Sequence, residues 1–180
     1  MTWDAVHHRG EVLRHVVAEA NSRRDGALPM ELPGVTEVFG GEFDLVTALQ
    51  MRWHTRLAGR IDQELLEQHA DLDSAVLTAW RATARELAGV REILDACGAA
   101  PTSQELGQAL AVSRRKDWQL LAASAGQAAM SRSGTLRAGR LLEERARAGG
   151  DPAEVPLDHR DDAAGRPVSL IGRLRAHLAA

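Results

Sequence analysis

At 180 residues, 44% of them hydrophobic and 26% charged, the chain is long enough for one domain with a hydrophobic core, or for a domain plus an extension. Its one cysteine excludes an internal disulfide, no run approaches the length of a membrane span, and no export signal is visible, so a cytoplasmic location is expected. The net charge of −3 divides into −7 over residues 1–105 and +4 over residues 106–180, which permits a nucleic-acid or acidic partner but excludes the charge density of a dedicated nucleic-acid binder.

The composition favours helices. Alanine, leucine and arginine dominate it, whereas aromatic residues make up only 3% and tyrosine is absent. One lysine accompanies twenty-one arginines, a bias that is typical of GC-rich genomes and indicates a bacterial source. The elements are therefore expected to be helices throughout.

The first predicted helix covers residues 3–24. Thr2 can cap its N-terminus, and Asp25-Gly26 is a natural end. Its apolar and small residues recur at steps of three and four, as on the buried face of a helix: Trp3, Val6, Gly10, Leu13, Val17 and Ala20. This face is expected to pack against other helices.

Residues 26–43 break this pattern. Prolines and glycines preclude a long helix there, while several apolar residues make the segment unsuited to a loose linker. The segment is predicted to be an ordered crossover loop with a helical turn at Val35–Phe39. Connections of this length are uncommon in compact domains and often functional, so a site is most expected in this loop.

Two long amphipathic segments, residues 44–69 and 73–97, are predicted to pair as a helical hairpin at the core of the fold. Asp71 or Asp73 can cap the second helix, which is expected to run to Gly98. The apolar seam of the first consists of Met51, His54, Ala58, Ile61 and Leu65, widened by Trp53 and Leu57. The seam of the second consists of Val76, Trp80, Thr83, Leu87, Val90, Leu94 and Cys97.

A fourth helix is predicted over residues 102–129, where Thr102 and Glu105 form a capping box. Together the helices predict an all-α fold: an antiparallel four-helix bundle over residues 1–130, with the ordered crossover loop between its first and second helices. Residues 131–180 are predicted to be a flexible, arginine-rich linker with amphipathic C-terminal helices.

One tryptophan falls on each of the four predicted helices: Trp3, Trp53, Trp80 and Trp118. Their rings are expected to turn inward, either as four core anchors or as the walls of an aromatic-lined ligand pocket. His54 lies on the inward face of the second helix and completes this candidate pocket. It is expected either to bind a ligand or metal, or to be a structural histidine that is hydrogen-bonded to Thr83 or to an acid.

Residues 102–121, TSQELGQALAVSRRKDWQLL, are similar to a helix-turn-helix. The resemblance implies that the second helix would enter the major groove, where Arg114, Arg115 and Lys116 would contact phosphates or base edges. Ala111 stands where the turn usually has a glycine. The alternative is one continuous helix of the bundle with a polar step in its middle.

The sequence contains no motif that names a reaction. P-loop, dinucleotide-binding, zinc and nucleophile signatures are all missing, so no catalytic residue and no cofactor is predicted. His8, Glu11 and His15 share one face of the first helix at a spacing that can bind a metal, but this face lies opposite the apolar seam. A solvated helix face is the simpler explanation, and no metal site is predicted.

The function predicted from these features is non-enzymatic: a cytoplasmic regulatory module that binds a protein partner or a second copy of itself. The interaction is assigned to an amphipathic C-terminal segment, one face of which is lined by Leu170, Ile171, Leu174 and Leu178. Four arginines before it would add charge complementarity: Arg137, Arg140, Arg145 and Arg147. Deleting residues 149–180 is predicted to leave the bundle folded and to abolish partner binding.

Two other functions stay open. A transcriptional regulator would read DNA through residues 102–121. A small-molecule- or metal-binding bundle would use the space between the tryptophans, His54 and the crossover at residues 26–43. Whether that space is filled or left as a cavity separates this second alternative from a purely structural core.

Overall fold

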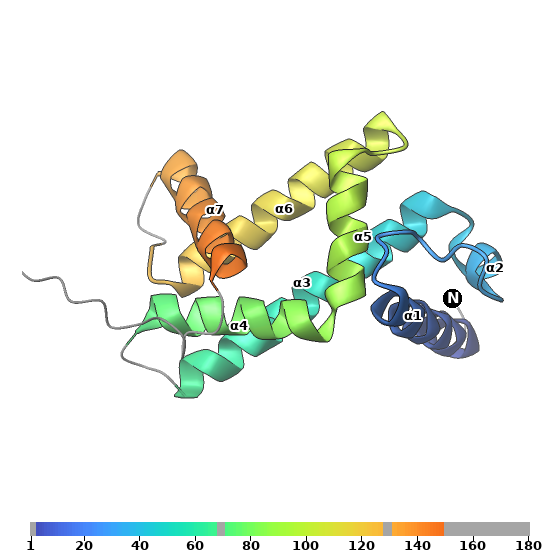
Figure 1. The fold of residues 1–180 in the computed structure, drawn as a ribbon, viewed down its shortest axis with the longest axis horizontal. Helices are drawn as coiled ribbons and strands as arrows, with labels where there is room; N and C mark the ends of the chain where they lie inside the picture. The colour runs from blue at the N-terminus through green and yellow to red at the C-terminus, as the bar shows by residue number, and fades with distance from the viewer. Residues whose placement is uncertain (1–2, 68–70, 128–130, 150–180) are drawn as a thin grey trace, which may run out of the picture. The chain divides into compact units, whose positions relative to one another are not determined.

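The computed structural model describes residues 3–67, 71–127 and 131–149, with side chains from His7 onward (Figure 1). Every regular element in these residues is a helix, which confirms the predicted all-α class. Residues 1–149 form one compact unit, and residues 150–180, a second unit, lie outside the described residues. The helices are α1 (Trp3–Arg23), α2 (Val35–Phe39), α3 (Glu42–Glu67), α4 (Leu72–Glu86), α5 (Ala88–Ala99), α6 (Gln104–Ser124) and α7 (Arg132–Ala148).

Local sequence signals account for several of the helix ends. Asp71 caps α4 as predicted, whereas the cap of α6 is Ser103 and not Thr102. In both cases the side-chain oxygen accepts a hydrogen bond from the amide three residues further on. The crossover contains the predicted helical turn as α2, whose Val35 and Phe39 are buried in the core. These ends follow from residues that are close together in the sequence.

The third predicted helix is broken at Leu87 into α4 and α5, and α5 turns sharply away from α4 there (Figure 1). Asn21 of α1 binds both sides of the break: its amide group donates to the Glu86 carbonyl over 2.9 Å and accepts the Gly89 amide over 3.0 Å. Gly89 is required at this contact, since a Cβ there would lie 1.8 Å from the carbonyl oxygen of Ala20. The break is therefore made by a contact with α1.

Residues 132–148, which the sequence places after the bundle domain, form α7, and this helix packs against α4 and α6 (Figure 1). Leu142 and Ala146 of α7 are buried, and Gly139 lies directly against the backbone of α6 at Trp118. The antiparallel four-helix arrangement is not confirmed by these seven helices of the described residues. A domain boundary at residue 130 stays a prediction.

α3 is the central helix of the compact unit. It contacts α1, α2, α4, α5 and α6, and its inward face buries Leu45, Val46, Leu49, Gln50, Trp53, Leu57 and Ile61. Trp53 is the largest fully buried side chain, and the candidate site lies beside it. Within the described residues, no helix combines the length and the hydrophobicity that a membrane crossing requires.

Candidate functional site

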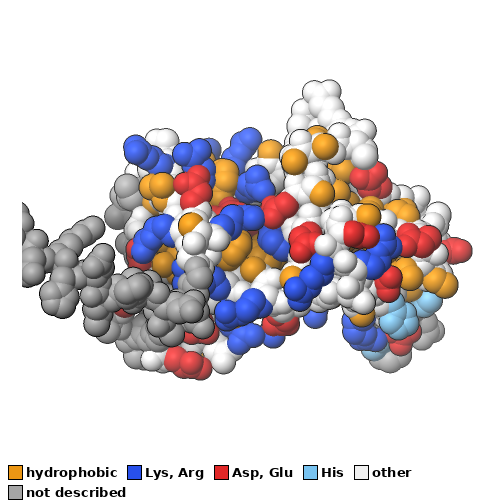
Figure 2. All heavy atoms as spheres, in the orientation of Figure 1, with side chains coloured by type: hydrophobic (Ala, Val, Ile, Leu, Met, Phe, Trp, Pro, Cys, Tyr) orange, Lys and Arg blue, Asp and Glu red, His pale blue; other side chains and the backbone are white. Residues whose placement is uncertain are grey.

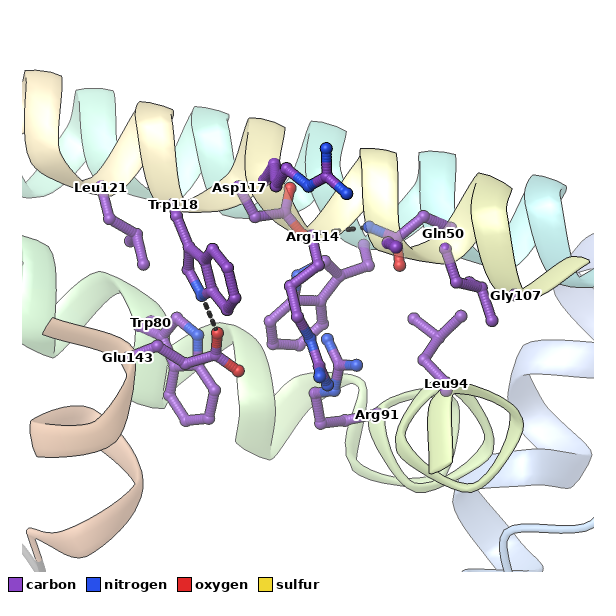
Figure 3. Close-up of a pocket in the computed structure, with 15 residues that line it drawn as sticks. Gln50, Trp80, Arg91, Leu94, Gly107, Arg114, Asp117, Trp118, Leu121 and Glu143 are labelled. Atoms are coloured by element: carbon purple, nitrogen blue, oxygen red, sulfur yellow. Dashed lines mark hydrogen bonds between the residues drawn. The ribbon is translucent and has the colours of Figure 1, made fainter. Parts of the chain in front are cut away.

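A cavity of about 250 Å³ lies beside Trp53, where α3, α4, α5, α6 and α7 all contribute side chains (Figure 3). Three indoles line it: those of Trp53, Trp80 and Trp118. Its apolar wall is completed by Leu94, Leu110 and Leu121, and its polar lining comes from Gln50, Arg91, Arg114, Arg115, Asp117 and Glu143. The space among these indoles is therefore not filled by the core.

Specific contacts hold the indole rings in place. Trp53 and Trp80 pack edge to face, with ring centroids 5.8 Å apart and ring planes at 73°. Trp118 is half-buried, and its Nε1–H donates a hydrogen bond to Oε2 of Glu143 on α7. The aromatic side of the cavity is thus preformed, because each of these three rings is held by a second side chain.

Three arginines converge on a single carboxylate next to the cavity. The Nη2 atoms of Arg91, Arg114 and Arg147 lie 3.0, 3.2 and 3.0 Å from Oδ1 of Asp95. Arg147 also reaches Oδ2 of Asp95 at 2.8 Å and Glu143 at 2.7 Å. We call Arg91, Arg114 and Arg147 the arginine cluster. It ties α5, α6 and α7 together and concentrates positive charge at the cavity.

Two members of the arginine cluster also stack on tryptophans. The guanidinium carbon of Arg91 lies 4.7 Å from the ring centre of Trp53, and that of Arg147 lies 5.1 Å from the ring centre of Trp80. Only 12% of the Arg91 side chain is exposed, and its Nε is buried without a hydrogen-bond partner among the described residues. Burial lowers the pKa of Arg91, and the neighbouring carboxylate of Asp95 opposes the shift.

Asp117 lines the cavity from α6 and is bonded to two side chains of α3. Its Oδ1 lies 2.6 Å from Nδ1 of His54, and its Oδ2 accepts a hydrogen bond from Nε2 of Gln50 over 3.0 Å. Burial raises the pKa of Asp117, and the contacts with His54 and Gln50 oppose part of this shift. This carboxyl group is therefore engaged by α3, and the positive charge of Arg91 also acts on it.

The residues predicted to form a pocket fall into three groups. Three of them line the cavity: Trp53, Trp80 and Trp118. His54 does not line it; this partly exposed histidine is hydrogen-bonded to an acid, Asp117. Trp3 belongs to α1, and its side chain lies outside the described residues. The crossover at residues 26–43, where a site was most expected, supplies no lining residue.

The structure contains no turn where the helix-turn-helix resemblance requires one. Residues 104–124 form the single helix α6, so the separate second helix that would enter a major groove is missing from this stretch. Its three candidate contacts have different surroundings: Arg114 pairs with Asp95, Arg115 lines the cavity, and Lys116 is exposed. The alternative of one continuous helix is confirmed.

The candidate partner-binding residues Leu170, Ile171, Leu174 and Leu178 lie outside the described residues. The arginines assigned to partner encounter have separate roles: Arg147 belongs to the arginine cluster, whereas Arg140 pairs with Glu144 on the outer face of α7. Within the described part of the chain, no three His, Cys, Asp or Glu side chains lie close enough to hold a metal ion.

Sequence reasoning missed Arg91, Asp95 and Glu143, which set the charge in and next to the cavity, and it assigned Arg147 to partner encounter instead. They form two pairs at i, i+4 spacing, one on α5 and one on α7, a pattern that is typical of solvated helix faces. The one available signal is that Arg91 and Asp95 flank the apolar residues Ile93 and Leu94. Spacing alone does not reveal that α7 meets α5 at these pairs.

The chain matches no protein-family model, no curated protein and no solved structure. We therefore infer the role of the cavity from the residues that line it. Figure 2 shows basic side chains gathered over α4, α6 and α7, with hydrophobic side chains visible between them. The cavity combines an apolar wall of indoles and leucines with charged side chains, and concave sites with apolar walls and placed polar groups are typical of small-molecule binding.

Proposed function

We propose that the compact unit of residues 1–149 is a small-molecule-binding domain whose ligand occupies the cavity between Trp53, Trp80 and Trp118. The observation that carries this proposal is the open space of about 250 Å³ at a position where packed indoles would be expected to close the core. A cavity of about 150 Å³ holds benzene. The space here therefore suits a compound of one or two rings.

The carboxylates that line the cavity are held in place by neighbouring side chains. Both lining carboxylates already have protein partners: Asp117 contacts His54 and Gln50, and Glu143 contacts Trp118 and Arg147. The cavity is best suited to holding a ligand between rigid walls.

A blocking substitution tests the proposal. Ala111 is exposed and lines the cavity from α6, so Ala111→Phe is expected to obstruct the opening and abolish ligand binding. Gln108→Phe is the matched control, because Gln108 is exposed on the same helix and outside the lining. Ligand-observed NMR with a library of one- and two-ring compounds should detect binders of the unsubstituted protein and of Gln108→Phe only. Absence of any binder, or equal binding by Ala111→Phe, contradicts the proposal.

Binding of a protein partner through the C-terminal segment stays a prediction, because its residues lie outside the described ones. Residues 1–149 form one compact unit. We therefore expect the chain that lacks residues 149–180 to keep its helical circular dichroism and its melting temperature. Sedimentation of both forms then checks whether self-association is lost with the segment. Unfolding of the shortened chain would show that the segment belongs to the core.

A further inference from the structure

We infer that the ligand is a planar aromatic carboxylate, whose carboxylate group meets Arg91 and Arg114 while its ring lies against Trp118 and Leu121. This inference rests on the proposed function, because it names the class of compound that the same cavity takes. Three observations support it: the charge balance around the cavity, the unused hydrogen-bonding capacity of its arginines, and the shape of its apolar wall.

The charge balance calls for an anion. The three guanidinium groups of the arginine cluster face two carboxylates, those of Asp95 and Glu143, which leaves one positive charge in excess. Arg115 and Asp117 add one further charge of each sign to the lining, so the excess of one positive charge remains. Partly buried like charges repel one another in a medium of reduced dielectric constant. A bound carboxylate would bring the cluster to neutrality.

The geometry of the arginines favours a carboxylate in particular. Arg114 extends from α6 toward Arg91 of α5, so the two guanidinium groups approach each other across the cavity (Figure 3). They share only one oxygen atom of Asp95, and Arg114, whose side chain is 42% exposed, makes its hydrogen bond within the described residues through Nη2. Planar guanidinium groups bind the two oxygens of a carboxylate through parallel hydrogen bonds. A ligand carboxylate would use donors that the protein leaves unpaired.

The apolar wall favours a flat ring next to that carboxylate. Trp118 stands beside Leu121 at one end of the cavity, and Leu94 lies at the other, with Arg91 and Arg114 between them (Figure 3). Half-buried indoles such as Trp118 form stacking or edge-to-face contacts with other aromatic rings. A compound with its carboxylate attached directly to a ring would meet the arginines and this indole at the same time.

The test compares 2-naphthoate with its uncharged analogue 2-naphthamide, by calorimetric titration of the full chain. We expect one naphthoate to bind per chain, about tenfold or more tightly than the amide, because a charge-assisted pair of hydrogen bonds distinguishes them. Arg114→Gln is expected to weaken naphthoate binding by about the same factor and to leave amide binding within about twofold. The fold should tolerate this change, since Asp95 keeps Arg91 and Arg147 as partners.

Arg140→Gln is the matched control, because Arg140 is an exposed arginine of α7 that pairs with Glu144 outside the cavity. It should leave both affinities unchanged. Equal affinity for the two compounds, full naphthoate binding by Arg114→Gln or by Ala111→Phe, or no naphthoate binding at all would each overturn the inference. The proposed function has its own test, since uncharged compounds that bind the unsubstituted protein and not Ala111→Phe would still support a ligand cavity.

Discussion

Replacing Gly139 with alanine is expected to lower the free energy of unfolding by about 3 kcal/mol or more, although alanine is the better helix former. A Cβ at this position of α7 would lie 1.9 Å from the carbonyl oxygen of Trp118 and 2.5 Å from its carbonyl carbon. These are backbone atoms of α6, so a side-chain rotation does not relieve the overlap, and the two helices have to separate. Urea denaturation monitored by circular dichroism measures the loss.

Gly59→Ala is the matched control for this substitution. Gly59 lies on the exposed face of α3, and a Cβ there meets no heavy atom within 4 Å. The same chemical change is therefore expected to raise the free energy of unfolding, by up to about 1 kcal/mol. The separation of α6 and α7 should also change the near-ultraviolet signal of Trp118 in Gly139→Ala. Equal stability of the two variants would contradict the packing of α7 against α6.

The parts of the fold that were predictable are those set by neighbours in the sequence. The spacing of apolar residues located α1 and α3, a run of glycines and prolines around Val35–Phe39 located α2, and Asp71 marked the start of α4. These signals placed the helices but not all of their buried faces: Met51 of the predicted α3 seam is exposed, and α1 buries Val12 and Val16 more deeply than the predicted Leu13 and Val17. Signals of this kind can be recognised without knowing which helices pack against one another.

The break at Leu87 was not predictable by the same means. Apolar residues continue through it at helical spacing, so the pattern favours one helix over residues 73–97. The deciding contact comes from Asn21, far away in the sequence, which binds Glu86 and Gly89 on either side. Gly89 and Gly139 are similar cases: the sequence shows a glycine inside a helix, and only the tertiary structure shows the backbone that approaches it.

The candidate site was predictable in its aromatic part and not in its charged part. The tryptophans lie on the apolar stripes that define each helix, so Trp53, Trp80 and Trp118 were expected to point inward together. Charged residues at i, i+4 spacing usually face solvent, so nothing local distinguishes Arg91 and Asp95 from an ordinary surface pair. Their role arises because α6 and α7 bring Arg114 and Arg147 to the same carboxylate.

Asp95→Asn is expected to lower the free energy of unfolding at pH 7 by about 2–3 kcal/mol. Breaking a fully buried ion pair costs about 3–5 kcal/mol, and the estimate here is smaller because a third of the Asp95 side chain is exposed. An asparagine amide offers one oxygen and places N–H donors against guanidinium groups, which are donors too. Three arginines of three helices would lose their common acceptor.

The lowered pKa of Asp95 determines how the stability lost in Asp95→Asn depends on pH. Burial alone would raise the pKa of Asp95, but hydrogen bonds and charges from Arg147 and Arg91 outweigh it, and the pKa is lowered. The stability that Asp95 contributes is therefore present above the ordinary pKa of an aspartate, near 4, and is lost as pH falls through the lower pKa of the folded state. The difference between the original chain and Asp95→Asn should be constant from about pH 7 to pH 5 and shrink below about pH 4.

Asp117→Asn, the same chemical change at the other side of the cavity, should behave in the opposite way. The pKa of Asp117 is raised by burial, so its contribution to stability is greatest at low pH and declines as pH rises through the folded-state pKa. Asparagine keeps the uncharged form and can still bond His54 and Gln50, so Asp117→Asn should gain stability relative to the original chain as pH rises. Chemical denaturation of both variants between pH 3.5 and 7, about the range where carboxylates titrate, distinguishes them. If the two variants followed the same pH profile, Asp95 would not be the carboxylate on which the arginine cluster depends.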